Sequence, residues 1–211
     1  MQAEWLFDDV PAESPLFADL NPTQREAVAA TEGPVLVVAG AGSGKTRVLT
    51  YRVAHLIRDL GVSPESILAI TFTNKAADEM RGRVGALVGG MVRSMWVSTF
   101  HSACVRILRR EAPRLGYRSG FSIYDDADSM RLIKMVTKDL DLDSKRFPER
   151  AMKGIISKAK NELVDYESFA DQGEGFFHTQ VADIYRLYQQ RLVEASAMDF
   201  DDLLMVTVEL F

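Results

Sequence analysis

Short apolar runs alternate with longer amphipathic stretches in the first half of this chain. The runs are rich in β-branched residues, are typical of strands buried in a parallel sheet, and cover residues 35–39, 67–72 and 95–98. Helices are predicted after them, over residues 45–60 and 74–88 and from residue 99 to about residues 113–116. Gly61 can end the first helix, and Asn74 is placed to cap the second. This alternation predicts an α/β domain with a parallel sheet.

The pattern changes after Gly120, where only helical periodicity remains. Asp125 and Asp126 precede an amphipathic stretch over residues 127–140, and Pro148 begins another that runs to about residue 163. Two further helices are predicted over residues 177–195 and from Asp199 to the end of the chain. An all-helical block after an α/β beginning predicts an insertion or a second domain.

Composition narrows the class of protein. The chain has 211 residues, of which 47% are hydrophobic and 26% charged, as in ordinary globular proteins. Cys104 is the only cysteine and cannot form an internal disulfide, so we expect a reducing, cytoplasmic setting. No apolar run approaches the roughly 20 residues of a membrane span, and the N-terminus lacks the features of a signal peptide. The sequence therefore predicts no membrane partner.

Charge is distributed unevenly along the chain. The net charge is −5, and residues 1–19 contain five acidic side chains and no Lys or Arg. We expect these residues to form an acidic, flexible leader, which Trp5, Leu6 and Phe7 could pin to the domain. Eight arginines lie between Arg81 and Arg118 with Glu111 as the only acid among them. Such a cluster is either a patch that attracts nucleic-acid phosphates or a solvated helix face.

The segment from Ala39 to Thr46 reads AGAGSGKT and lies between a predicted strand and a predicted helix, the context of a Walker A phosphate loop. Its glycines let backbone N–H groups and the helix N-terminus surround phosphate oxygens. Lys45 is then expected to reach the β- and γ-phosphates, and the Thr46 hydroxyl is expected to bind Mg²⁺. Kinases, GTPases, transporters and helicases share this loop, so the loop alone does not choose among them.

Gln24 precedes the predicted strand of the loop. In the segment Leu20 to Gln24 it completes a capping box with Asn21, ahead of Pro22 in the first turn of a helix. Its amide can also donate to and accept from the adenine edge, which would select ATP. Because Gln24 stands just ahead of a Walker A strand, the adenine role is favoured.

Polar and aromatic residues follow the other two predicted strands. Ligands of such sheets bind beyond the carboxyl ends of the strands. Thr71, Phe72, Thr73 and Asn74 end the second strand, and Thr99 and His101 follow the third. An aromatic ring at such an edge can stack on a nucleobase, and hydroxyl groups can hold phosphates. The alternatives are that Phe72 covers the sheet and that His101 caps a helix.

Four segments in order, LNPTQREAV (20–28), AGAGSGKT (39–46), ITFTNKAADEM (70–80) and VSTFHSACVRILR (97–109), resemble motifs Q, I, Ia and Ib of superfamily 1 DNA helicases of the UvrD/PcrA/Rep type. MDFDDLL (198–204) resembles the return from that family's helical insertion. The resemblance implies a RecA-like P-loop domain (1A, residues 20–111), a helical subdomain (1B, 112–197) and the start of the return to 1A (198–211). It also implies ATP-driven 3′→5′ movement on DNA in repair or replication, in a bacterial cytoplasm and near the nucleoid.

The resemblance also assigns roles to residues. ATP and Mg²⁺ are the implied cofactors, with single-stranded DNA and single-strand/duplex junctions as partners. The nucleotide-binding residues would be Gln24, Ala39, Gly40, Ala41, Gly42, Ser43, Gly44, Lys45, Thr46 and Arg47, of which Lys45 and Thr46 serve catalysis and Thr46 the metal. The DNA-binding residues would be Thr71, Phe72, Thr73, Asn74, Thr99 and His101. Lys153, Lys158 and Lys160 either help the insertion hold duplex DNA or form a solvated helix face.

Hydrolysis requires a further carboxylate on Mg²⁺ and a group that positions water. In the family these come from an Asp-Glu pair beyond the DFDD segment; Asp199, Asp201 and Asp202 instead look like the start of a helix. We therefore expect an N-terminal piece of a helicase that binds ATP without turnover. The alternatives are a P-loop kinase or another NTPase, a non-catalytic DNA- or protein-binding module, and a RecB-like nuclease-helicase.

Overall fold

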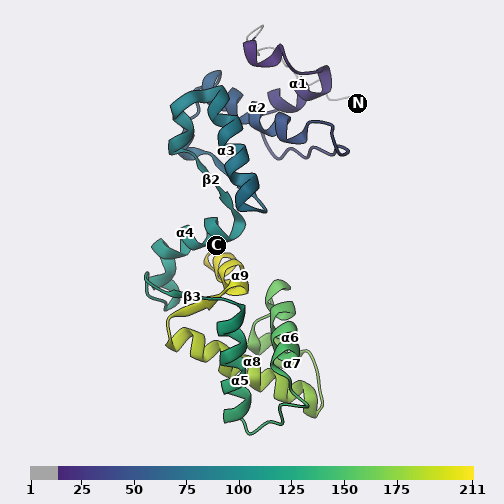
Figure 1. Cartoon of the computed structure of the whole chain (residues 1–211), viewed down its shortest axis with the longest axis vertical. Helices are drawn as coiled ribbons and strands as arrows, with labels where there is room; N and C mark the ends of the chain where they lie inside the picture. The colour runs from purple at the N-terminus through teal and green to yellow at the C-terminus, as the bar shows by residue number, and fades with distance from the viewer. Residues whose placement is uncertain (1–13) are drawn as a thin grey trace. The chain divides into compact units, whose positions relative to one another are not determined.

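The computed structural model describes residues 14–211, which form two compact units. Unit 1 extends to Thr99 and unit 2 runs from Phe100 to Phe211, so each is described by itself (Figure 1). The proposed anchors Trp5, Leu6 and Phe7 lie outside the described residues. No helix in the described part is long and apolar enough to cross a membrane.

Unit 1 combines helices with a pair of parallel strands. Its elements are η1 (Pro15–Phe17), α1 (Pro22–Ala29), α2 (Lys45–Arg58), η2 (Pro64–Ser66), β1 (Leu68–Thr71), α3 (Asn74–Val88), η3 (Gly89–Ser94) and β2 (Trp96–Thr99). Strands β1 and β2 pair in parallel, and Thr71 is the partner of Thr99 at their carboxyl ends. Helices α2 and α3 bury Val53, Ala54 and Val84 in the core of the unit. The predicted mixed α/β architecture with parallel strands is confirmed for these two strands.

The predicted leader does not extend to residue 19 as a separate segment. Residues 15–17 form a short 3-10 helix, which Ser14 caps, and Leu16 is 5% exposed in the core of unit 1. Leu20 is also buried, against Val28 and Val48. Apolar contacts with α1 and α2 therefore hold residues 14–20 against the unit.

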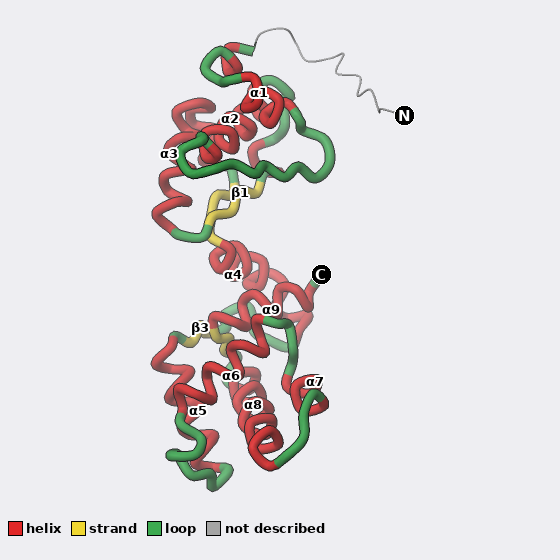
Figure 2. Tube along the Cα trace, turned by 90° about the vertical axis from the view of Figure 1, so that its right-hand side faces the viewer, coloured by secondary structure: helices red, strands yellow, loops and turns green. Residues whose placement is uncertain are grey.

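The first predicted strand, residues 35–39, is a loop between α1 and α2 (Figure 2). The side chains of Leu36 and Val38 are 87% and 86% exposed. An extended segment becomes a strand only when a neighbour completes its hydrogen-bond ladder, and no described segment pairs with this one. The prediction of a buried strand at residues 35–39 is therefore wrong on both counts, because the strand is not formed and these apolar side chains are exposed.

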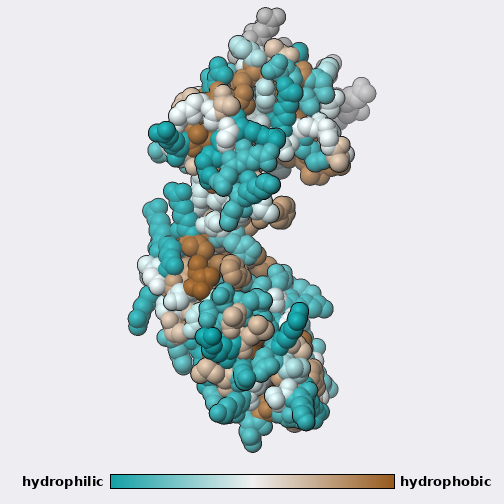
Figure 3. Space-filling model, in the orientation of Figure 1, coloured by the Kyte–Doolittle hydropathy of each residue, from teal (hydrophilic) through white to brown (hydrophobic). Residues whose placement is uncertain are grey.

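Unit 2 is mostly helical. Its elements are α4 (Phe100–Glu111), η4 (Ala112–Leu115), β3 (Ser122–Tyr124), α5 (Asp126–Asp139), α6 (Glu149–Asn161), α7 (Tyr166–Asp171), α8 (Phe176–Glu194), β4 (Ala197–Asp199) and α9 (Phe200–Leu210). Its larger core cluster includes Ile133, Ile156 and Leu192 from α5, α6 and α8. A second cluster joins Leu108 of α4 to Leu203 of α9. In the view of Figure 3, hydrophobic side chains gather beside α4.

Two features of unit 2 differ from the prediction. The stretch after Gly120 is not purely helical, because β3 and β4 pair in parallel, with Tyr124 opposite Asp199. The sequence also gave no indication of α7. The compact units divide at Thr99 because α4 packs against α9 in unit 2, whereas the predicted boundary between 1A and 1B lies after residue 111. That boundary stays a prediction about domains of a longer protein.

Candidate nucleotide- and DNA-binding site

The glycine-rich loop needs glycine at two positions for its backbone. Gly42 and Gly44 have φ angles of 77° and 87°, in the left-handed region that residues with a Cβ rarely adopt. Gly44 is the N-cap of α2 and provides no side-chain cap. The first N–H groups of α2, on Lys45, Thr46 and Arg47, have no intrahelical acceptor, and the helix dipole adds positive potential there. The geometry fits an anion such as phosphate.

Lys45 folds back onto the loop that precedes it. Its Nζ atom donates to the carbonyl oxygens of Ala39 and Gly40, each at 2.7 Å. The Ser43 hydroxyl donates to the same Gly40 oxygen at 2.7 Å. Lys45 and Thr46 are both exposed. The Lys45 ammonium is therefore held over the loop by bonds to neutral carbonyls alone.

Gln24 touches the loop directly. Its side-chain Nε2 donates to the Ser43 carbonyl at 3.1 Å. A Cβ at Gly44 would lie 2.8 Å from that nitrogen, so only glycine permits this approach. The same residue completes the capping box: Asn21 accepts from the Gln24 N–H at 2.9 Å, and Gln24 Oε1 accepts from the Asn21 N–H at 3.2 Å. The capping box is confirmed, and Gln24, the predicted adenine residue, lies beside the glycine-rich loop.

Arg47 lies on the first turn of α2. Its guanidinium is 5.4 Å from the centre of the Tyr51 ring, and 3.9 Å separates it from the Asp19 carboxylate. Tyr51 also donates to Asp19, at 3.3 Å. The side chain is exposed next to the loop, on the same helix turn as Thr46.

The strand ends bring most of the predicted DNA-binding residues together. Thr71 and Thr99 are partners in the parallel ladder, and Phe72 follows with 90% of its side chain exposed. Thr71 Oγ1 donates to the Thr73 carbonyl at 3.0 Å. The cap of α3 is Thr73, which accepts from the Ala76 N–H at 3.1 Å, and not Asn74 as predicted. Thr73 has the extended backbone that a cap requires, while Asn74 is already helical.

His101 belongs to unit 2, whereas the other predicted DNA-binding residues belong to unit 1. Its ring packs edge-on against Phe200, with 5.8 Å between the ring centroids. This pairs the first turn of α4 with that of α9. The role of His101 in DNA binding stays a prediction.

The arginine cluster is divided between the units and is partly structural. Arg81 donates to the Val97 carbonyl at 2.7 Å and pairs with Asp78 at 2.6 Å. Arg109 lies 4.1 Å from the centre of the Phe121 ring and donates to the Phe121 carbonyl at 2.6 Å. These two side chains hold the fold together and do not form a free phosphate-binding patch.

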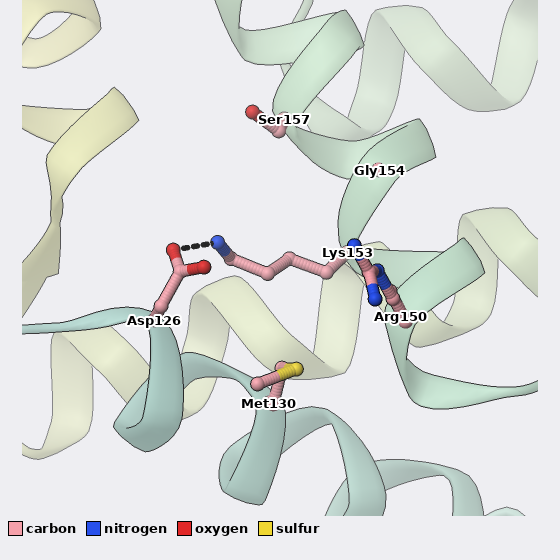
Figure 4. A pocket seen from close by; sticks show the side chains of 6 residues that line it. All are labelled: Asp126, Met130, Arg150, Lys153, Gly154 and Ser157. Atoms are coloured by element: carbon pink, nitrogen blue, oxygen red, sulfur yellow. Dashed lines mark hydrogen bonds and ion pairs between the residues drawn. The ribbon is translucent and has the colours of Figure 1, made fainter.

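The three lysines of α6 have different surroundings. Lys153 points toward Asp126 of α5, with which it forms an ion pair, and Arg150 and Ser157 line the same cavity of about 450 Å³ (Figure 4). Lys158 has a 77% exposed side chain at 4.0 Å from the Glu162 carboxylate. Lys160 is buried, which neither of the two interpretations of these lysines predicts.

Lys160 is the centre of a buried polar cluster that connects α6, α8 and α9. Its Nζ atom donates to the carboxylates of Asp199 and Asp202 at 2.8 Å each. Tyr188 donates to Asp199 at 2.8 Å, and Gln189 donates to Asp202 at 3.1 Å. Asp199 and Asp202 also form the capping box of α9, which confirms the predicted helix start. The capping pattern is visible in the sequence, but the lysine partner is 39 residues from Asp199.

The charged groups of this cluster shift one another's pKa values. Burial opposes the charge of Lys160, yet the carboxylates of Asp202 and Asp199 raise its pKa above the ordinary value. Burial also opposes ionisation of Asp199, but Lys160 holds the pKa of Asp199 below its usual range. Burial, assisted by Asp199, raises the pKa of Asp202 to about 6 despite Lys160. One cation shared by two carboxylates therefore leaves a surplus negative charge.

Residues 20–211 match the UvrD/REP helicase N-terminal domain. The chain belongs to this family. It is 51% identical over 196 residues to the ATP-dependent DNA helicase PcrA of Bacillus subtilis, a comparison that covers 93% of this chain and 26% of that protein. The PcrA protein of Staphylococcus epidermidis is 52% identical over 93% of this chain and 27% of its own length. That of Leuconostoc citreum is 49% identical over 91% of this chain and 26% of its own length. The chain thus spans about a quarter of the length of these relatives.

Proposed function

We propose that this chain is the first nucleotide- and DNA-binding part of an ATP-dependent DNA helicase that moves 3′→5′ on single-stranded DNA. The proposal rests on the names of its relatives and on one observation. Gln24 lies against Gly44 and Ser43, so a group that can recognise adenine adjoins a loop built for phosphate. A phosphate loop without this neighbour would suit any NTPase.

The residues of the loop divide the work of binding Mg-ATP. Backbone N–H groups of the loop and of α2 would bind phosphate oxygens, and Lys45 would exchange its two carbonyl acceptors for the β- and γ-phosphates. The Thr46 hydroxyl would bind Mg²⁺, which neutralises phosphate charge. Arg47 adds a cation beside Thr46, and Ala39 to Ser43 shape the turn. The proposed contacts of Lys45 would join opposite charges, whereas its present acceptors are neutral carbonyls.

Single-stranded DNA would bind at the carboxyl ends of β1 and β2. The exposed Phe72 ring can stack on a base, while Thr71, Thr73, Asn74 and Thr99 supply polar groups near the phosphates. We include His101 in this track, although it belongs to unit 2. We further propose that residues 20–111 form part of a RecA-like domain 1A and that residues 112–197 form the insertion 1B.

Hydrolysis requires a carboxylate on Mg²⁺, and two carboxylates of the DFDD segment are already engaged. Asp199 and Asp202 cap α9 and hold Lys160, so neither is available to a metal ion. We therefore propose that the 211-residue chain binds ATP without hydrolysing it. The whole protein would act at single-strand/duplex junctions in repair or replication, in the cytoplasm and near the nucleoid of a bacterium.

Nucleotide binding by the chain tests the first part of the proposal. Lys45→Ala should weaken ATP binding roughly ten-fold or more, since hydrogen bonds to charged groups contribute about 1.5–3 kcal/mol. Gln24→Ala should reduce the preference for ATP over GTP, and Lys138→Ala, an exposed lysine of α5, serves as the control. Unchanged ATP affinity in Lys45→Ala would refute the phosphate-loop assignment. Transfer of phosphate to an acceptor would instead favour the kinase alternative.

Fluorescence anisotropy with a labelled oligonucleotide tests the DNA track. Stacking contributes about 1–3 kcal/mol per base, so Phe72→Ala should weaken binding roughly ten-fold. Met91→Ala removes another exposed apolar side chain of unit 1 and should have no effect. Equal losses in both variants would remove the DNA track from this strand edge.

A further inference from the structure

A cavity in unit 2 carries charge of one sign only. Its volume is about 510 Å³, and residues of η4, α7, α8 and α9 and the segments next to them line it. Its walls include four carboxyl groups and no Lys, Arg or His: Asp165, Glu167, Asp202 and Glu209. The cavity is therefore a site of negative potential with partly apolar walls.

Three of these carboxylates have no ion-pair partner within the described part of the chain. Asp202 pairs with Lys160 at 2.8 Å, and Lys160 is not among the residues that line the cavity. In the described part of the chain, no basic side chain lies within 4.0 Å of Asp165, Glu167 or Glu209. The cavity thus gathers carboxylates that remain available to a ligand.

Three tyrosine rings also line the cavity. Tyr117 and Tyr185 are 7% and 1% exposed, and Tyr166 is half-buried beside them. Burial and the nearby Asp202 carboxylate raise the pKa values of Tyr117 and Tyr185 well above the ordinary value, as expected in a negative environment. Tyrosine faces attract cations, and they bind guanidinium groups in particular by stacking.

We propose that this cavity binds a guanidinium group, as carried by an arginine side chain. A guanidinium is planar, weakly hydrated and always charged, and its paired N–H groups match carboxylates such as Glu167 and Glu209. Leu115, Val193 and Val206 offer apolar surface for the methylene groups that carry it. This ligand is separate from the nucleotide and DNA of the proposed function.

Calorimetric titration of the 211-residue chain tests the site. N-acetyl-arginine amide should bind saturably, whereas N-acetyl-citrulline amide, which has the same shape without the charge, should not. The double variant Glu167→Gln/Glu209→Gln should weaken binding roughly five-fold or more, because each exposed ion pair contributes modestly. The control Glu65→Gln/Glu174→Gln removes the same charge at exposed acids outside the cavity and should bind as the wild type does.

A second variant and two further ligands complete the test. Val193→Trp fills the cavity from a 41% exposed position, so it should abolish binding while the fold remains intact. A blocked Gly-Arg-Gly peptide that binds more tightly than N-acetyl-arginine amide identifies a protein segment as the source of the guanidinium. If spermidine binds at least as tightly as the peptide, the cavity prefers alkylammonium ions and the proposal is overturned. Equal binding of the arginine and citrulline amides would also overturn it.

Discussion

Replacing Lys160 with methionine should destabilise unit 2 severely. Methionine fills similar space but removes the cation, which leaves Asp199 and Asp202 buried at 6% and 1% exposure without a counter-ion. Each carboxylate keeps neutral donors, Tyr188 for Asp199 and Gln189 for Asp202. Removal of one partner from a buried ion pair costs about 3–5 kcal/mol. Here two carboxylates lose the same partner, so we expect a loss at the upper end of that range at neutral pH.

Urea unfolding followed by far-UV circular dichroism measures this loss, and hydrogen exchange assigns it to α6, α8 and α9. Trp96 lies in β2 of unit 1 and no tryptophan follows it in the chain, so tryptophan fluorescence does not report on unit 2. The matched control is Lys158→Met on the same helix. Its side chain is 77% exposed and its pair with Glu162 measures 4.0 Å, so its effect should stay within about 0.5 kcal/mol.

A double variant distinguishes loss of charge balance from loss of space. Lys160→Met/Asp202→Leu replaces part of the cluster by apolar groups, and such replacements often restore stability. The double variant should therefore be more stable than Lys160→Met alone, with a favourable coupling energy in the double-mutant cycle. A loss below about 1 kcal/mol in Lys160→Met, or no recovery in the double variant, would refute the assignment of this cluster as a buried ion network.

Three further predictions follow from the described contacts. Burial raises the pKa of Asp202 from 3.8 to about 6. The protonated carboxyl group therefore stabilises the fold fully below about pH 4, and this stabilisation is lost as the pH rises through 6. Relative to Asp202→Asn, the wild type should lose on the order of 2 kcal/mol of unfolding free energy between about pH 4 and 7 in urea titrations. Gly44→Ala should cost about 1–2 kcal/mol of unfolding free energy and weaken ATP binding, because the φ angle of Gly44 is 87° and the new Cβ would displace Gln24. The control Gly154→Ala has open space around it and should not destabilise the chain. Leu16→Ala should cost about 2–3 kcal/mol in thermal unfolding, and a smaller loss than about 0.5 kcal/mol would place residues 14–19 outside the fold of unit 1.

Local signals allowed much of the fold to be predicted. Helix starts at Asp125, Asp165 and Asp199 depend on side chains that accept the N–H three residues later, and two of these were predicted. The glycines of the predicted phosphate loop are an equally local signal, since Gly42 and Gly44 have the positive φ angles that such a turn requires. Errors at this level were small, as when Thr73 and not Asn74 proved to be the cap.

Long-range partners set the limit of prediction. Residues 35–39 have the composition of a strand, but strand formation depends on a neighbour, and no described segment provides one. Strands β3 and β4 are three residues each and pair across more than 70 positions, which no local pattern reveals. Lys160 resembles its exposed neighbour Lys158 in sequence, and only the fold places it between Asp199 and Asp202.

Gln24 takes part in a helix cap and in a contact with the glycine-rich loop at the same time. Its Oε1 and backbone N–H complete the capping box with Asn21, while its Nε2 points to the loop at Ser43. The cap uses the acceptor side of the amide and thereby fixes which way the donor side faces. A residue needed only for the cap could be replaced by Glu, which accepts the same N–H. Glutamate would instead bring a negative charge against the phosphate loop and could not donate to an adenine nitrogen. The proposed nucleotide site would therefore require an amide at residue 24, whereas the helix cap alone does not distinguish Gln from Glu.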